Sequence, residues 1–252
     1  MSFTFDDFPR TAYTAGGSIL RQFGARGTFY AAPGLMGSSN GLGDQFHLDD
    51  LHCLIEDGHE LGSHTFHHVS SLKTPLSVFL EEVREGRAAM EKLSGLAVSN
   101  NFAYPFGAVS AAAKRVVSRE MLSCRSIFRG VNAPFADLNL LRANALYGDS
   151  DQLDLVRRLL DDNEQRKGWL IFYTHDVREN PSPYGCTPRL FESTVKSVFE
   201  RRMPILSVRE VLARKGRDER RSADGTKAAY VVPQSKSDAE VRLTGSQGTS
   251  VS

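Results

Sequence analysis

The stretch GHELGSHTFHH, residues 58–68, places four histidines and one glutamate within eleven positions. Imidazole fills a protein core poorly, so packing does not explain this density of histidines. His59 and Glu60 followed by His64 give the spacing H-E-x-x-x-H, one residue longer than the HExxH zinc signature. Residues five apart do not share a helix face, and the intervening glycine and serine disfavour a helix, which excludes a zinc site of that type.

His64 and His68 have a spacing that lets two imidazoles converge on one ion if Thr65–His68 forms a helical turn. His67 would then point elsewhere. Two histidines are too few for a catalytic metal site, because an open site commonly has three protein ligands and a water. A third ligand is therefore expected from another segment of the chain.

The segment FTFDD, residues 3–7, supplies candidates for that ligand. Its two aspartates directly follow an alternating apolar strand, and the carboxyl ends of strands carry the functional side chains of α/β barrels. Adjacent side chains point in different directions, so one carboxylate can bind an ion while its neighbour accepts a proton. A turn that simply ends the strand is the alternative. His175, in WLIFYTHDV (169–177), also follows an apolar strand, and there a hydrogen-bonded structural histidine is the alternative.

Short apolar runs with strand character alternate with stretches of helical periodicity. The runs are SFTF (2–5), GTFYAA (27–32), NFAY (101–104), LSCRSIF (122–128), LNLLRA (138–143), WLIFYT (169–174) and MPILSV (203–208). Thr74-Pro75 and Thr187-Pro188 each predict a helix start with a threonine N-cap and a first-turn proline. This alternation predicts parallel βα units, and hence an α/β barrel or a doubly wound sheet.

The composition is typical of a globular protein, with 252 residues of which 40% are hydrophobic and 24% charged. The pattern of strands and helices ends near Arg214, so we expect one folded domain over residues 1–215 and a polar, largely disordered tail over 216–252. With 31 basic and 30 acidic residues, charge gives no indication of nucleic-acid or anionic-membrane binding. No apolar run approaches the roughly 20 residues that cross a bilayer.

Three cysteines bear on the compartment. Cys53, Cys124 and Cys186 are odd in number and widely spaced, which indicates free thiols in a reducing environment. The N-terminal sequence shows no basic stretch followed by an apolar one, so nothing marks it for secretion. We therefore expect a cytoplasmic protein, and the sequence gives no indication of its oligomeric state.

TFDD (4–7), GHELGSHTFHH (58–68), YPFG (104–107) and YTHD (173–176) together resemble motifs of a known enzyme family. The family is the polysaccharide deacetylases, whose NodB-homology domain is grouped as carbohydrate esterase family 4. The resemblance covers roughly residues 2–212. It implies a distorted (β/α) barrel and a hydrolase with a divalent metal ion, most often zinc, that acts on an N-acylated carbohydrate.

The resemblance also implies roles for the clustered residues. Asp6 is the general base and His175 the general acid. The metal ligands are Asp7, His64 and His68. These roles form a coherent reaction, because a divalent ion makes water nucleophilic, the base takes the proton of that water, and the acid protonates a departing amine.

The YPFG match implies that the backbone N–H of Phe106 helps to bind the oxyanion, with Pro105 shaping the groove wall and Tyr104 among the substrate-binding residues. The family usually has an arginine two residues before this proline, paired with the catalytic aspartate, but here that position is Ala103. We hypothesise that Arg142, in the apolar LNLLRANAL, takes its place, since a buried guanidinium needs a carboxylate partner. An arginine that reaches solvent from a strand end is the alternative.

A second departure concerns the family's Asp-Trp motif, which has no match, so the residues that support His175 are not identified. The single tryptophan, Trp169, opens a strand and is expected in the core. The loops at 32–47 and 178–188 follow predicted strands. Each is either a substrate loop, with Tyr184 as a wall residue in the second, or an ordinary connection.

The favoured function is removal of an N-acyl group, expected to be acetyl, from an amino-sugar-containing oligo- or polysaccharide or its precursor. The cytoplasmic location points to a precursor. A glycan-binding barrel without turnover and a hydrolase of a non-sugar amide are the alternatives. An iron(II) oxygenase also uses two histidines and a carboxylate, but the adjacent His175-Asp176 does not match its H-x-D/E pair.

Overall fold

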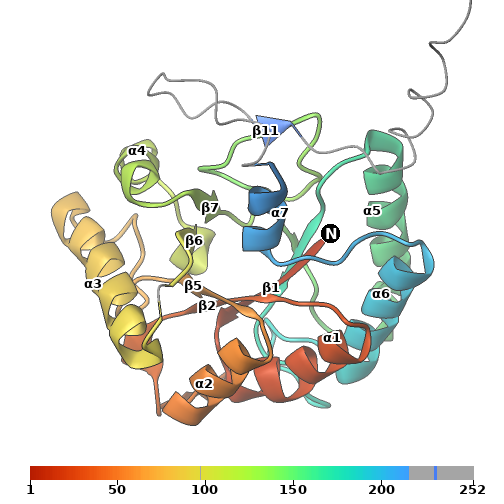
Figure 1. Cartoon of the computed structure of the whole chain (residues 1–252), viewed down its shortest axis with the longest axis horizontal. Helices are drawn as coiled ribbons and strands as arrows, with labels where there is room; N and C mark the ends of the chain where they lie inside the picture. Colours follow the sequence, from red (N-terminus) through yellow and green to blue (C-terminus); the bar gives the residue numbers. More distant parts are fainter. Residues whose placement is uncertain (97, 216–229, 232–252) are drawn as a thin grey trace, which may run out of the picture.

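The computed structural model describes residues 1–96, 98–215 and 230–231, which build an α/β barrel-like fold around one curled parallel sheet (Figure 1). The seven strands lie in the order β7-β6-β5-β2-β1-β10-β9. In chain order they are β1 (Ser2–Asp7), β2 (Thr28–Ala31), β5 (Glu60–Ser63), β6 (Asn101–Ala103), β7 (Ser123–Arg125), β9 (Asn144–Ala145) and β10 (Ile171–Thr174). All their pairings are parallel, so the predicted α/β barrel is confirmed.

Helices surround this sheet, and Figure 1 shows α3, α2, α1, α6 and α5 following one another around its outer side. The helices are α1 (Ser18–Gln22), α2 (Leu48–Glu56), α3 (Leu76–Ser94), α4 (Ala111–Glu120), α5 (Leu153–Arg166), α6 (Pro188–Glu200) and α7 (Val208–Lys215). Shorter elements are the π-helix η1 (Ala12–Gly17), the 3-10 turns η2 (Pro33–Leu35), η3 (Pro105–Gly107) and η4 (Ser150–Gln152), and the paired strands β3 (Ser39–Asn40) and β4 (Gly43–Asp44).

The alternation in FTFDD decides which way the first strand faces. Phe3 and Phe5 point toward the helix layer, where their rings lie 5.4 Å from that of Phe191 on α6. Successive residues of a strand point to opposite faces, so Thr4 and Asp6 point into the barrel. The sequence thereby places the Asp6 carboxylate inside the barrel, because Phe3 and Phe5 of the same strand take the opposite face.

The two predicted helix starts have different outcomes. The hydroxyl of Thr187 accepts a hydrogen bond from the Leu190 N–H at 3.2 Å, so the predicted N-cap of α6 is confirmed. At α3 the N-cap is Pro75 and not Thr74, and no side chain caps this end. Pro75 has an extended ψ of 140°, so the first helical residue is Leu76 and the prediction for Thr74 is wrong by one position.

The segment 138–146 closes the barrel without forming the strand predicted at 138–143. The N–H of Leu141 bonds to the Cys124 carbonyl of β7 at 2.9 Å, and the N–H of Leu146 bonds to the Tyr173 carbonyl of β10 at 2.9 Å. Only its later part, β9, pairs as a regular strand with β10. One irregular segment therefore bridges the two ends of the sheet: it pairs first with β7, then leaves it and pairs with β10.

The predicted strand at 203–208 is also wrong. Its Leu206 N–H bonds to the Met1 carbonyl at 2.9 Å, but the segment joins no sheet and leads directly into α7. The tail predicted over 216–252 lies outside the described residues except for Tyr230–Val231, which form β11 and pair antiparallel with β8 (Phe135–Ala136).

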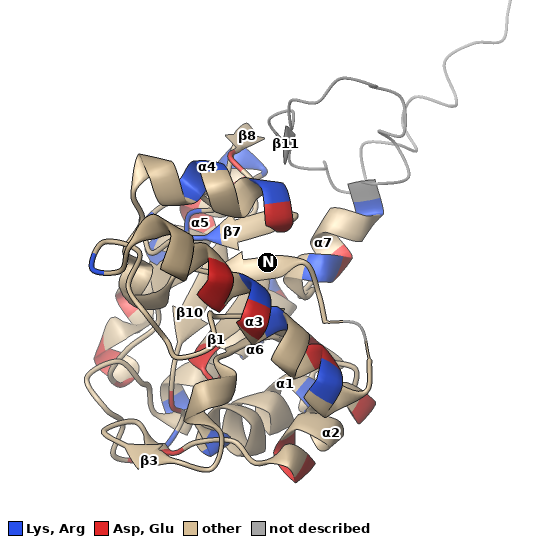
Figure 2. Ribbon diagram, turned by 90° about the vertical axis from the view of Figure 1, so that its left-hand side faces the viewer, with Lys and Arg blue, Asp and Glu red and all other residues tan. Residues whose placement is uncertain are grey.

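Charges of both signs share the helix surfaces, as the colouring of α3 in Figure 2 shows. Several pair with one another, such as Arg84 with Glu120 at 2.5 Å and Arg87 with Glu91 at 3.1 Å. Among the described residues, no helix combines the length and apolarity that crossing a bilayer requires.

A buried carboxylate organises the amino end of the barrel. Glu60 accepts hydrogen bonds from the hydroxyls of Ser99 and Thr28, at 2.5 and 2.8 Å, and from the side-chain amide of Asn101 at 2.5 Å. It also accepts the Arg209 N–H at 2.7 Å, in the first turn of α7. One fully buried side chain thus links β2, the approach to β6 and the final helix.

We expect Glu60→Gln to lower the free energy of unfolding by about 2–3 kcal/mol, because an amide NH₂ group would face donors that now have an acceptor. Glu192→Gln, at an exposed position on α6, is the matched control and should change stability by less than about 0.5 kcal/mol. Chemical denaturation of both variants measures the difference. Equal stability of the two would show that the Glu60 network does not hold the barrel end.

Candidate metal and catalytic site

Asp6 and Asp7 end β1 at the carboxyl edge of the sheet. Asp7 and the following Phe8 have positive φ angles of 64° and 65°, so the chain turns sharply there. The Phe8 ring stacks on Phe46 at 4.8 Å, which anchors the turn in the core. The turn separates the directions of the two carboxylates, as expected for adjacent residues.

The three predicted metal ligands converge. The Nε2 atoms of His64 and His68 lie 3.3 and 3.0 Å from Oδ1 of Asp7, and the ligand atoms of all three residues lie within 4.8 Å of one another. Asp7 Oδ1 is buried and has no hydrogen-bond donor. Two imidazole nitrogens that face this unpartnered carboxylate oxygen form a donor set that fits a divalent cation of the zinc type.

The backbone that brings the histidines together is not the predicted helical turn. Thr65 and His68 have φ angles of 62° and 55°, in the left-handed region. The Thr65 hydroxyl accepts the Val69 N–H at 3.1 Å and closes the loop 65–69, which begins directly after His64 and contains His68. The prediction of a helical turn is therefore wrong, because the loop reverses direction at each of its ends.

Neighbouring groups orient the ligands. Nδ1 of His64 lies 2.8 Å from the Ala103 carbonyl, which can only accept, so Nδ1 carries the proton and Nε2 presents its lone pair. The His68 ring packs on Phe106 with centroids 4.4 Å apart. Burial alone would raise the pKa of Asp7, but the adjacent His64 and His68 rings hold it far below its usual value.

The other two histidines of the stretch 58–68 have different surroundings. Nδ1 of His67 pairs with Glu82 of α3 at 2.8 Å, and its ring is largely exposed. His59 is buried, its Nδ1 accepts the Gly27 N–H at 3.0 Å, and burial lowers its pKa to about 4. The structure thus separates the dense cluster into two site histidines and two histidines that stabilise neighbouring segments.

The partner of Asp6 is Arg125, which the sequence analysis did not identify. Nη2 of Arg125 lies 2.5 Å from both carboxylate oxygens of Asp6, and both side chains are buried. Burial alone would lower the pKa of Arg125, but the Asp6 carboxylate keeps it above its usual value. Arg125 ends β7 and pairs in register with Ala103, so it starts one strand away from the position where the family's arginine is absent.

Two aromatic rings guide Arg125 across the barrel. Its guanidinium carbon lies 5.4 Å from the centroid of Tyr30 on β2 and 4.9 Å from that of Tyr173 on β10. These contacts are cation–π interactions around a buried guanidinium. Gly62 makes room for this arrangement, because a Cβ there would lie 2.6 Å from the Tyr30 ring.

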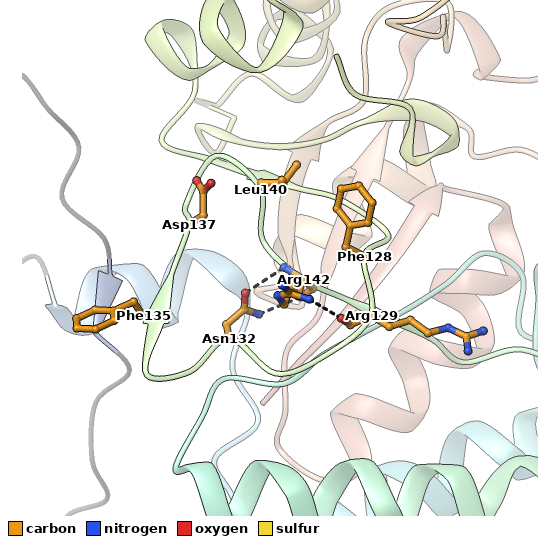
Figure 3. Close-up of a pocket in the computed structure, with 7 residues that line it drawn as sticks. All are labelled: Phe128, Arg129, Asn132, Phe135, Asp137, Leu140 and Arg142. Carbon is orange, nitrogen blue, oxygen red and sulfur yellow. Dashed lines mark hydrogen bonds between the residues drawn. The ribbon is translucent and has the colours of Figure 1, made fainter. Parts of the chain in front are cut away.

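Arg142 does not reach Asp6, so the prediction that it replaces the missing arginine is wrong. Its neighbours Leu141 and Ala143 are buried, which directs the Arg142 side chain outward. Nη1 of Arg142 bonds to the Arg129 carbonyl at 2.9 Å. Arg142 lines a cavity of about 470 Å³ whose other lining residues are Phe128, Arg129, Asn132, Phe135, Asp137 and Leu140, none of them a predicted catalytic or metal-binding residue. Figure 3 shows these residues around Arg142.

The YPFG segment contributes one exposed residue to the site. Phe106 has a φ of 60° and is 64% exposed beside His68, whereas Pro105 is buried. Tyr104 is also buried, with its ring 5.2 Å from that of Phe102 in an apolar cluster. The prediction that Tyr104 binds substrate is therefore wrong, because its side chain packs on the opposite side from the site.

His175 lies beside Asp6 through strand register. Phe5 of β1 pairs with Thr174 of β10, so the next residues on the two strands, Asp6 and His175, are level with each other. Nδ1 of His175 lies 3.1 Å from the Tyr184 carbonyl, and the two rings are 5.8 Å apart. Trp169 is buried and donates its indole N–H to Ser2 at 2.9 Å, so the expected core position is confirmed.

Solved structures share this fold at low sequence identity. A family 4 acetyl xylan esterase from Clostridium thermocellum, in complex with cobalt, is 18% identical, with a TM-score of 0.60 over 85% of this chain and 91% of the other. The peptidoglycan deacetylase PdaC from Bacillus subtilis is 16% identical, with a TM-score of 0.54 over 86% and 92%. The deacetylase PplD from Streptococcus pyogenes, in complex with acetate, is 19% identical, with a TM-score of 0.50 over 57% of this chain and 62% of that protein.

No curated protein sequence matches the chain. The model of the family described as polysaccharide deacetylase matches residues 1–122, a range that contains both aspartates, both site histidines and the YPFG segment. Over this range, the chain is similar to the polysaccharide deacetylase family.

Proposed function

We propose that this protein is a metal-dependent hydrolase that removes an N-acyl group, acetyl in the simplest case, from an amino sugar in an oligo- or polysaccharide or its precursor. The observation that carries the proposal is the convergence of Asp7, His64 and His68 next to a second carboxylate, Asp6. The family match over residues 1–122 supports the same class of reaction.

The metal would be held by Asp7 Oδ1 and the two histidine Nε2 atoms. This donor set suits zinc and leaves positions for water and substrate. A bound divalent ion supplies an activated water and polarises the acyl carbonyl. The hydrogen bond from His64 to the Ala103 carbonyl fixes the imidazole that donates its lone pair.

The proton transfers belong to residues on neighbouring strands. Asp6 is not needed as a ligand, and Arg125 fixes its carboxylate, so we assign it the proton of the attacking water. We assign His175, level with Asp6, the delivery of a proton to the departing nitrogen, which is otherwise a poor leaving group. The backbone N–H of Phe106, in the turn beside His68, is the proposed donor to the oxyanion.

The surface around these groups suits a sugar. Phe106 is 64% exposed on the side of His68, and Tyr184 is 56% exposed on the side of His175. Aromatic faces on two sides of a polar site offer flat apolar walls with polar groups between them. The cytoplasmic location stays a prediction and would favour a soluble or lipid-linked precursor as substrate.

Asp6→Asn should lower acetate release from N-acetylglucosamine oligomers by between about 10²- and 10⁴-fold, because the amide cannot accept the water's proton. Its metal content should stay that of the wild type, since Asp6 is not a proposed ligand. Asp154→Asn, at an exposed position of α5, is the matched control. A wild-type protein that binds metal and glycan without releasing acetate would favour the glycan-binding barrel instead.

His64→Ala should lose both the bound metal and the activity, whereas His67→Ala should keep both, because His67 pairs with Glu82 away from the site. Metal content by mass spectrometry and acetate release are measured on the same samples. A chelator should inactivate the wild type, and added Zn²⁺ should restore it. Retention of stoichiometric metal by His64→Ala would rule out this ligand set.

Arg125→Met should weaken activity and also stability, by about 3–5 kcal/mol, because it leaves the buried Asp6 carboxylate without a partner. Arg142→Met is the matched control and should change activity less than about twofold, because Arg142 lies in the separate cavity. Acetate release and denaturation midpoints distinguish the two arginines. A larger loss of activity and stability in Arg142→Met than in Arg125→Met would contradict this prediction and would instead indicate that Arg142 pairs with Asp6.

A further inference from the structure

A single backbone oxygen holds the imidazole of His175. The Tyr184 carbonyl accepts the His175 backbone N–H at 3.2 Å and lies 3.1 Å from its Nδ1. A carbonyl can only accept, so the neutral ring carries its proton on Nδ1 and leaves Nε2 for the site. Within the part of the chain that the structure describes, no carboxylate forms an ion pair with this ring.

The position of that carbonyl depends on a buried carboxylate next to His175 in the chain. Asp176 is fully buried, and its two oxygens accept the Ser182 hydroxyl at 2.5 Å and the Ser182 N–H at 2.8 Å. The Ser182 hydroxyl in turn accepts the Tyr184 N–H at 3.2 Å. A continuous chain of hydrogen bonds therefore runs from Asp176 through Ser182 to the residue that holds His175.

The surrounding loop is built tightly around Asp176. The Asp176 carbonyl accepts the Cys186 N–H at 2.9 Å, and Arg178 forms an ion pair with its carboxylate at 2.8 Å. At Gly185 a Cβ would lie 2.4 Å from the Asp176 side chain, so only glycine fits against it. A buried charge with this many partners costs free energy to break apart, which makes the loop a rigid support.

We propose that Asp176 and Ser182 are positioning residues for His175, and that they fix its tautomer and ring orientation through the Tyr184 carbonyl. The inference rests on the proposed function for the role of His175 as the acid, but the geometry of the imidazole is independent of that role. Asp176, buried inside the loop, thus orients the His175 ring indirectly, through Ser182 and the Tyr184 carbonyl, instead of by a direct contact with the imidazole.

The test is Ser182→Ala, which breaks the hydrogen-bond chain while leaving the Asp176–Arg178 ion pair in place. Nitrogen-15 NMR of the neutral His175 ring, assigned by comparison with His175→Gln, reports its tautomer without any turnover. The wild type should show the Nδ1–H form, and Ser182→Ala a mixture of both forms. Ser118→Ala on α4 is the matched control, since its hydroxyl bonds only to the nearby Arg115 carbonyl.

Turnover gives the second measurement. With an N-acetylated sugar, kcat of Ser182→Ala should fall between about 10- and 100-fold, with KM little changed. With 4-nitrophenyl acetate, whose leaving group needs no proton, the loss should stay below about threefold. Asp176→Asn should follow the same pattern if it folds, and Ser182→Ala carries the test if it does not.

The two parts fail separately. An unchanged tautomer in Ser182→Ala would overturn the positioning role, whether or not the protein is a deacetylase. Equal losses on the amide and the ester would also overturn it, because a general fault in the site and not a misplaced acid would then explain the effect. A wild type with the expected tautomer but no acetate release would reject the proposed function and leave the positioning of His175 intact.

Discussion

The ion pair between Arg125 and Asp6 is the constraint on which the interior of this barrel depends. Both side chains are buried, and taking two charges out of water costs several kcal/mol each unless they are paired and oriented. Tyr30 and Tyr173 provide ring faces beside the Arg125 guanidinium that help to position it for this pairing. Strands β1, β2, β7 and β10 must therefore keep their relative positions for the charge to stay compensated.

That rigidity is needed because the site itself is built on strained backbone. Asp7, Thr65, His68 and Phe106 have φ angles of 64°, 62°, 55° and 60°. A non-glycine residue in the left-handed region costs of order 1–3 kcal/mol and persists only where the surrounding structure determines it. Asp7 ends β1, Thr65 and His68 lie in the loop after β5, and Phe106 lies in the turn after β6. The barrel stabilises local conformations that would otherwise relax and separate the three proposed ligands, Asp7, His64 and His68.

Much of this arrangement follows from simple patterns in the sequence. The alternation in FTFDD places Asp6 inside the barrel, and the same alternation applied to NFAY explains the position of Tyr104. Asn101 and Ala103 share one face of β6, and Phe102 and Tyr104 share the other, so Tyr104 packs with its aromatic neighbour in the apolar cluster. Its place next to a site motif suggested substrate contact, but strand periodicity already indicates the core.

Strand alternation does not show which arginine, Arg125 or Arg142, pairs with Asp6. Both arginines lie in short apolar runs, and a buried guanidinium is equally compatible with LSCRSIF and LNLLRANAL. The difference arises from the irregular closure of the barrel, where segment 138–146 pairs first with β7 and then with β10. Because a segment that changes its pairing strand midway has no regular alternation of side chains, the sequence does not show whether Arg125 or Arg142 points into the barrel.

Electrostatics explains why Asp6 and His175, the two residues to which we assign the proton transfers, have different supports. Asp6 is an acid residue in the barrel interior, so its orienting partner must be a cation, and Arg125 supplies the charge. His175 is oriented by the neutral Tyr184 carbonyl, while Asp176, the buried carboxylate that follows it in the chain, pairs with Arg178 and accepts hydrogen bonds from Ser182. Arg125 and Arg178 each balance a buried aspartate, so among the site residues that the structure describes, the proposed ligand Asp7 is the carboxylate without a cationic arginine partner. A cation bound by Asp7, His64 and His68 would then meet one uncompensated carboxylate. This electrostatic setting favours its retention beside Asp6 and His175, to which we assign the proton transfers.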